Sequence, residues 1–223
     1  MTSITRCSWC GTDPLYISYH DKEWGIPVHD DAILFEFLTL EWAQAGLSWI
    51  TVLRKRENYR KHFHTWNIEK IADMTDEELE TILLDSWAVR NRLKIFSVRR
   101  NAKVALEIQK EFGSLDQYFW SDHWFRHCDF AKQSSKQRRI PYNSWIATPR
   151  ARNDRNEETK NFPIINYPEI LSEVPAETLI SKAISKDLKK RGMSFVGSTI
   201  MYAFMQAVGM VDDHIESCFR KQS

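Results

Sequence analysis

Apolar residues recur at helical spacing along most of this chain. In segment after segment they stand three or four positions apart, as in an α-helix with one buried face. The strict alternation of apolar and polar residues that marks a strand is weak. The pattern predicts helices over residues 31–45, 48–63, 75–84, 90–112, 114–124, 176–190 and 196–209, with a last turn through His214 and Cys218. We therefore expect an all-α fold.

Residues at the ends of these segments support several boundaries. Ser48 stands where an N-cap is needed. Thr75 is followed three residues later by Glu78, which is the spacing of a capping box. Gly113 stops the long amphipathic segment, and residues 132–168 interrupt the pattern with basic residues and prolines. We expect a long, polar, basic loop over 132–168.

Composition narrows the class of protein. The chain has 223 residues, of which 43% are hydrophobic, so it can bury a sizeable core. Nine Trp are many for this length, and aromatic faces suit stacking sites as well as cores. Only 7 Gly occur, and none form a phosphate-binding glycine loop. The net charge of +1 excludes no class of partner, because a neutral protein can carry one basic face.

Cysteine usage points to a reducing compartment. Four Cys in a chain of this length do not make a disulfide scaffold. No apolar signal core and no apolar run long enough to cross a membrane is visible. We expect a cytoplasmic protein without membrane contact, in which cysteines that matter are metal ligands or nucleophiles.

Cysteine and histidine gather at the two ends of the sequence. His214 and Cys218 are four residues apart, so on a helix they would share one face and chelate one ion. Cys7 and His20 are available at the front to complete a tetrahedral zinc site. Cys10 is an alternative fourth ligand, since Cys7 and Cys10 form a C-x-x-C, which is also a redox pattern. Spacing alone leaves these alternatives open.

A tight turn between the last two predicted helices is a candidate anion site. Gly192 is placed to end one helix, and Gly197 opens the next, where free N–H groups and the helix dipole favour an anion. Lys190, Arg191 and Ser198 lie beside it, and such a hairpin can hold a DNA phosphate without reading sequence. An ordinary helix connection with a solvated basic face fits this segment equally well.

Several motifs together resemble one known family. The first motif runs from Asp13-Pro14 through Tyr16, Tyr19 and His20 to Trp24-Gly25. The second runs from Leu40-Glu41 to Gln44-Ala45-Gly46-Leu47-Ser48-Trp49. Two more complete the set, Lys189 to Gly197 and Asp213-His214. In these motifs, over residues 6–125 and 170–219, the sequence resembles the bacterial DNA-3-methyladenine glycosylase type I family.

The resemblance implies a helix–hairpin–helix DNA glycosylase fold with a structural zinc joining the two ends of the chain. Matching positions give Cys7, His20, His214 and Cys218 as zinc ligands, which favours His20 over Cys10. The implied unit has two helical lobes. A zinc-binding lobe comprises residues 1–30 and 170–223, and a helical lobe comprises residues 31–131.

The resemblance also implies a pocket for a base flipped out of DNA. Glu41 matches the acidic residue that recognises the base and aids its departure, and Tyr19 positions it. Trp49 matches the stacking aromatic, and Tyr16, Trp9 and Trp24 match other pocket aromatics. The implied activity is hydrolysis of 3-methyladenine from double-stranded DNA by a monomer, without strand cleavage.

Alternatives stay open at this stage. A zinc-containing lesion-binding protein without hydrolysis, or a glycosylase for another base, would share these motifs. Trp42 and Trp87 stand where smaller residues are expected, and a ring pointing into the pocket would change the substrate range. Asp212 and Asp213 either supply a catalytic carboxylate or, as we expect, orient His214 or cap the last turn.

Overall fold

The structure, a computed structural model, is almost entirely helical. It describes residues 4–44, 46–85, 91–127 and 162–221. The longer helices are α1 (Pro14–Lys22), α2 (Asp31–Ala43), α3 (Trp49–His62), α5 (Asp76–Leu84), α6 (Arg92–Phe112), α10 (Leu179–Lys190) and α11 (Ser198–Ala207). The short elements are η1 (Ser8–Cys10), η2 (His64–Trp66), α4 (Ile68–Ala72), α7 (Leu115–Phe119), α8 (His123–His127) and η4 (Leu171–Glu173). The all-α expectation is confirmed.

Helix ends follow the expected local chemistry. The capping box at Thr75 is present, with Glu78 N–H donating to the Thr75 hydroxyl and Thr75 N–H donating to the Glu78 carboxylate. Gly113 ends α6 with a φ of 95°, a left-handed conformation that glycine adopts without strain. Ser48 is the N-cap of α3, but its hydroxyl bonds to the Thr51 hydroxyl and not to a backbone N–H.

The structure departs from the sequence predictions at three places. Helix α1 lies before the first predicted helix. Its start is signalled by Asp13, the N-cap, whose carboxylate accepts from two backbone N–H groups, and by Pro14 in the first turn. The predicted helix over 114–124 is two helices, α7 and α8, because α7 ends at a cap on Trp120. The helical geometry considered for His214 and Cys218 does not occur. The chain there runs from a short strand into turns, with Cys218 N–H bonded to the Ile215 carbonyl at 2.8 Å.

A two-stranded parallel pairing replaces the end of the predicted loop. Strand β1 (Ile164–Ile165) pairs with β2 (Val211–Asp212). These strands are too short for alternation to reveal them, so only the tertiary contact defines them. The rest of the predicted loop, residues 128–161, lies outside the described residues, as does Trp87.

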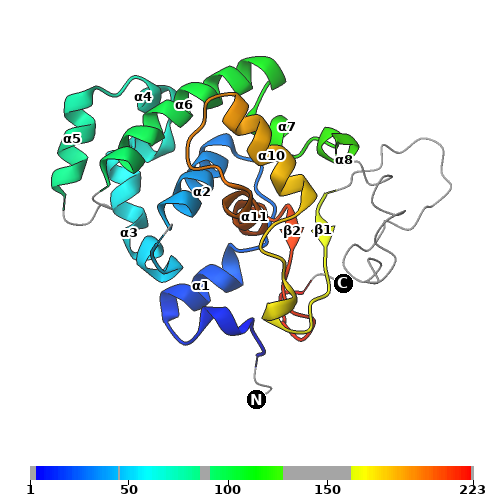
Figure 1. The fold of residues 1–223 in the computed structure, drawn as a ribbon. Coiled ribbons are helices and arrows are strands. Elements are labelled where there is room, and N and C mark those ends of the chain that lie inside the picture. The colour runs from blue at the N-terminus through cyan, green and yellow to red at the C-terminus, as the bar shows by residue number, and fades with distance from the viewer. Residues whose placement is uncertain (1–3, 45, 86–90, 128–161, 222–223) are drawn as a thin grey trace.

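One continuous apolar core joins the helices. It includes Leu34 and Leu38 of α2, Ile95 and Val98 of α6, and Phe204 of α11, all with no exposed side-chain surface. Helix α2 packs on α3, α6, α7 and α11, so it runs through the middle of the molecule (Figure 1). The division into two lobes stays a prediction, since the same core continues through both.

The first and last described segments lie together. Phe219 N–H donates to the Thr5 carbonyl at 3.0 Å, which joins the two segments directly. None of the described helices has the length and apolarity needed to cross a membrane.

Candidate active site

Helix α2 carries an acidic residue to a cavity in the middle of the molecule. The helix starts at Asp30, whose carboxylate accepts from Ile33 N–H at 2.9 Å. From Leu34 to Ala43 all of its residues are buried, and this burial fixes the helix firmly. Glu41, near its C-terminal end, is 6% exposed and lines the cavity.

The cavity has a volume of about 270 Å³ and a mostly aromatic wall. Besides Glu41 it is lined by Trp9, Tyr16, Tyr19, Trp24, Gln44, Trp49, Leu171, Val174, Ala203, Gln206 and Asp213. We call it the aromatic cavity. All six residues that the sequence predicted for catalysis or base binding line it, although they come from η1, α1, the turn after α1, α2 and α3.

Trp9 organises one side of the aromatic cavity. Its ring centroid lies 5.1 Å from that of Tyr16 and 5.0 Å from that of Trp24. On the other side, the Tyr19 and Trp49 rings lie 5.4 Å apart. These edge and tilted contacts hold the rings in fixed orientations, so the cavity presents preformed aromatic surfaces to a flat ligand.

The carboxyl group of Glu41 is chemically unusual. Burial raises its pKa to about 8, and no hydrogen bond or ion pair joins it to another described residue. At neutral pH the empty cavity therefore holds mostly the neutral acid. Burial, and then the charge of Glu41, raise the pKa of Tyr19 well above its usual value, so Tyr19 is a neutral phenol.

Three polar residues that line the cavity were not among the predicted site residues. Gln44 is the C-cap of α2. It also lines a second hollow with Gly46, Leu47, Thr199 and others, and this hollow shares Glu41 and Ala203 with the aromatic cavity. The other two polar residues are Gln206 and Asp213. The motif containing Gln44 was visible in the sequence, but its position one turn after Glu41 was the only signal of a shared face.

The two aspartates after α11 have different surroundings. Asp213 accepts hydrogen bonds from Asn166 Nδ2, Tyr202 OH and Gln206 Nε2, each at 2.7 Å. Asp212 accepts from the backbone N–H of His214 and contacts His214 Nδ1, both at 3.0 Å. The expectation that an aspartate orients His214 is confirmed for Asp212, whereas Asp213 belongs to the wall of the aromatic cavity.

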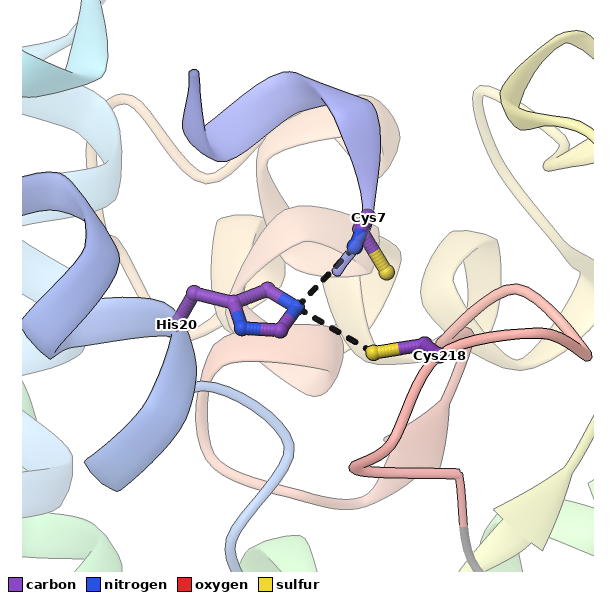
Figure 2. A group of neighbouring side chains, drawn as sticks. All are labelled: Cys7, His20 and Cys218. Carbon is purple, nitrogen blue, oxygen red and sulfur yellow. Dashed lines mark hydrogen bonds between the residues drawn. The ribbon is translucent and has the colours of Figure 1, made fainter. Parts of the chain in front are cut away.

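A Cys/His group joins the two ends of the chain. Cys7, His20 and Cys218 are all buried, and each offers one donor atom within 4.8 Å of the other two. Their side chains point toward one another (Figure 2). His20 Nε2 lies 3.5 Å from Cys218 Sγ. Cys10 is buried but does not belong to this group of described residues.

His214 lies beside the group without belonging to it in this geometry. Its ring centroid is 5.2 Å from that of His20, and its Nε2 is buried with no hydrogen-bond partner among the described residues. The Nδ1 atoms of both histidines face carboxylates, His20 toward Asp21 at 2.8 Å and His214 toward Asp212. His20 Nε2 faces the group and accepts from Cys7 N–H at 3.4 Å (Figure 2). Each ring has a carboxylate behind it, as in many zinc sites.

The predicted hairpin is present between α10 and α11. We call residues 191–197 the hairpin segment. Gly192 follows the end of α10 with a φ of 101°, and Gly197 is the N-cap of α11. Lys190 is exposed. Arg191 and Ser198 are already engaged: Arg191 binds Glu111 and Asp187, and the Ser198 hydroxyl donates to the Glu177 carboxylate.

Trp42 does not enter the aromatic cavity. It is 1% exposed and stacks on Phe195 of the hairpin segment, with ring centroids 5.7 Å apart. A ring next to Glu41 in the sequence therefore points toward the hairpin, because adjacent helical residues face different directions. The size of the cavity is not reduced by this departure from the expected small residue.

Comparison with known proteins decides the family. The family model described as methyladenine glycosylase matches residues 9–153 and 155–221, so the match continues into the 132–168 segment. A DNA-3-methyladenine glycosylase of Haemophilus influenzae is 40% identical over 219 residues, covering 98% of this chain and 99% of that relative. This chain belongs to the methyladenine glycosylase family.

Solved structures of methyladenine glycosylases have the same fold. A crystal structure of 3-methyladenine DNA glycosylase I is 38% identical with a TM-score of 0.79, and the alignment covers 98% of this chain and 100% of that one. A variant of such an enzyme in complex with 3-methyladenine is 27% identical with a TM-score of 0.78, covering 98% of each chain.

Proposed function

We propose that this protein hydrolyses the N-glycosidic bond of 3-methyladenine in double-stranded DNA. Membership of the methyladenine glycosylase family supports the reaction class. The observation that carries the proposal is Glu41, a buried carboxyl group that lines the aromatic cavity and has no hydrogen-bond or ion-pair partner among the described residues. The relative in complex with 3-methyladenine supports the same choice of base.

Recognition rests on the positive charge of the alkylated base. A nucleotide methylated at N3 of adenine is cationic, and electron-rich rings and a carboxylate attract a cation. Trp49 and Tyr16 supply ring faces, and stacking contributes roughly 1–3 kcal/mol per base. The cation favours the ionised form of Glu41, so binding releases a proton from a group whose pKa is about 8. A neutral adenine gains neither contribution.

Hydrolysis then needs little acid catalysis. The bond between the base and C1′ of the sugar breaks with its electron pair going to the base, which leaves as neutral 3-methyladenine. Water adds to C1′ of the cationic sugar and loses its proton to solvent. Glu41 stabilises the developing positive charge and Tyr19 holds the base in place. The product is an abasic site in an intact strand, and we expect the enzyme to act as a monomer.

One assay tests this proposal. Methylated duplex DNA is incubated with the protein, and released bases are identified by chromatography. We expect 3-methyladenine to appear and Glu41→Ala to abolish its release. The control is Glu69→Ala, which removes an exposed glutamate on α4 and should release base normally. Binding to abasic-site DNA with no release from any alkylated substrate would instead identify a lesion-binding protein, and release of another base would change the specificity.

We further propose that one zinc ion is held by Cys7, His20, Cys218 and His214. The close donor atoms, the orphaned Nε2 of His214 and the carboxylates behind both histidines support this ligand set. Burial raises the pKa of Cys7 to about 12, so a thiolate there needs a cation beside it. The ion would join the chain ends and fix the segment carrying Tyr16 and Tyr19; four protein ligands leave no site for water.

Zinc analysis of two variants tests the ligand set. Cys218→Ala should lose zinc and unfold at lower urea concentration than the wild type. Cys10→Ala is the matched control, since Cys10 is a buried cysteine outside the Cys/His group. We expect it to keep one zinc per chain. Full zinc content in Cys218→Ala, or zinc loss in Cys10→Ala alone, would show that the ligand set is wrong.

For the DNA backbone we propose the hairpin segment and its flanks. Gly192 and Gly197 let the backbone approach a phosphate closely, and the first N–H groups of α11 point outward from the helix start. Lys190, Arg191 and Ser198 complete the predicted set. The carboxylates on Arg191 and Ser198 compete with a phosphate for those two side chains, so the glycines and Lys190 contribute most.

A further inference from the structure

The hairpin segment lies along one stripe of α6. Asn101 of α6 is 1% exposed, and its side chain holds Ser194 at both backbone groups, with Ser194 N–H donating to Oδ1 at 2.9 Å and Nδ2 donating to the Ser194 carbonyl at 3.0 Å. A side chain at Gly192 would contact Val104, and Arg191 reaches Glu111. Positions 101, 104 and 111 share one face of a helix, so α6 fixes the hairpin segment along its length.

An arginine side chain lies at each end of the contact between α6 and the hairpin segment. The two differ in whether carboxylates neutralise the charge of the guanidinium. Arg191 donates to Glu111 at 2.5 and 3.1 Å and to Asp187 at 2.6 Å, and only 22% of its side chain is exposed. Its charge is matched by two carboxylates. A phosphate would have to displace one of them, at the cost of an existing ion pair.

Arg100, at the other end, is exposed and has no ion pair with any carboxylate in the described part of the chain. Its Nη1 donates to the Ser194 hydroxyl at 2.9 Å, which holds the guanidinium beside the hairpin segment. The preceding residue, Arg99, points elsewhere and binds Asp76 and the Met74 carbonyl. Arg100 thus combines a fixed position at the hairpin with an unmatched positive charge.

We propose that Arg100 binds a DNA phosphate next to the hairpin segment. A guanidinium offers several N–H donors in one plane, which suits two phosphate oxygens at once. The contact with Ser194 places this guanidinium at the turn that leads to Gly197, the N-cap of α11, and the first N–H groups of an α-helix have no acceptor within the helix. This inference rests on the proposed function. The contact would hold the backbone and give affinity without base selectivity.

Salt dependence of binding tests the inference. The probe is a duplex containing a stable abasic-site analogue, titrated between about 50 and 200 mM salt, because each lost phosphate contact lowers the slope of log affinity against log salt by about 0.9. We expect Arg100→Gln to lower the slope by that amount and to weaken binding about three- to tenfold at low salt. Arg100→Lys should restore most of the slope. Base release at saturating DNA should be unchanged in both.

A matched control separates Arg100 from its neighbour. Arg99→Gln removes the adjacent arginine, which is paired with Asp76, and should keep the wild-type slope. A wild-type slope in Arg100→Gln, or an equal reduction of the slope in Arg99→Gln, overturns the inference. A wild-type protein that binds this probe but releases no 3-methyladenine would defeat the proposed function instead.

Discussion

Two buried glutamates on helix α2 have opposite surroundings. Glu36 and Glu41 are 1% and 6% exposed, and they lie five residues apart. Five residues turn an α-helix by about 140°, so the two side chains leave it in nearly opposite directions. Glu36 faces α3, and Glu41 faces the aromatic cavity.

Two arginines neutralise the charge of Glu36. Arg56 donates to its carboxylate at 2.7 Å, and Arg60 donates at 2.8 and 3.0 Å. Burial by itself would raise the pKa of Glu36, but hydrogen bonds from the two arginines outweigh burial and lower it. The carboxylate is therefore ionised and joins α2 to α3.

Glu41 has no such partner in the part of the chain that the structure describes, and burial raises its pKa to about 8. The comparison shows that burial does not decide the chemistry of a carboxyl group; the partners do. A buried glutamate that is paired with arginines joins two helices, and one that faces a cavity without such a pair is available to a ligand.

The largest effect should come from Glu36→Ala. This substitution leaves Arg60 and the buried Arg56 with less compensation, and breaking a buried ion pair costs about 3–5 kcal/mol in the free energy of unfolding. Urea denaturation measures the loss. The control is Glu57→Ala, which removes the exposed partner of Arg60 and should cost less than about 0.5 kcal/mol. Equal losses in the two variants would contradict the comparison.

Stability should depend on pH with opposite signs at the two sites. The folded pKa of Glu41, about 8, lies above its ordinary value of 4.5, so its contribution is full below pH 4.5 and is lost as the pH rises through 8. The free energy of unfolding of the wild type should fall relative to Glu41→Gln over this range, by a few kcal/mol. The lowered pKa of Glu36 acts in the other direction, since its contribution is lost on acidification below its ordinary value. If the difference in the free energy of unfolding between wild type and Glu41→Gln does not change with pH, the raised pKa of Glu41 is wrong.

Glu41→Gln should affect catalysis without weakening the fold. Glutamine keeps the shape but cannot become the anion that the cationic base favours. Loss of a charged hydrogen bond is worth about 1.5–3 kcal/mol, so kcat/KM for 3-methyladenine release should fall about 10- to 100-fold. Full activity in this variant would show that the ionised form is not needed.

The smallest effect should come from Arg60→Gln. Its side chain is 35% exposed, so its ion pair with Glu36 is partly screened by solvent, and we expect a loss of about 1 kcal/mol in the free energy of unfolding. Base release per folded molecule should not change. A loss as large as that of Glu36→Ala would mean that Arg60, and not Arg56, is the main partner.

Much of the fold was predictable because its signals are local. The period of apolar residues gave the helices, Thr75 and Glu78 gave a capping box, and Gly113 gave the end of α6. After α11 the sequence indicated a last turn, and the helical geometry considered for His214 and Cys218 does not occur. Cys218 comes close to His20 through turns and through bonds to distant backbone, such as Glu216 N–H to the Pro168 carbonyl at 2.8 Å. Spacing of ligands in sequence does not distinguish a helix from such turns.

The candidate site was predicted in part. Glu41 and the aromatic residues were identified through motif resemblance, and they line one cavity. Arg191 was predicted as a phosphate ligand from its place beside two glycines, but the sequence could not show that Glu111, 80 residues away, occupies its guanidinium. Asp213 was considered as a catalytic carboxylate but was expected to orient His214 or cap the last turn, and the structure instead places it at the aromatic cavity. Gln206 was not identified, because nothing near it in the sequence marks the wall of a cavity.

The sequence by itself determined the all-α class and several helix ends, because these depend on neighbours three or four positions apart, and the resemblance of its motifs to a known family identified the site residues. Only the tertiary structure decided which charges are matched. Glu36 and Glu41 are the same residue on the same buried helix, and Arg100 and Arg191 are the same residue beside the same turn. Partners from distant segments neutralise Glu36 and Arg191 and leave Glu41 and Arg100 for a ligand, and such partners are set by packing and not by local pattern.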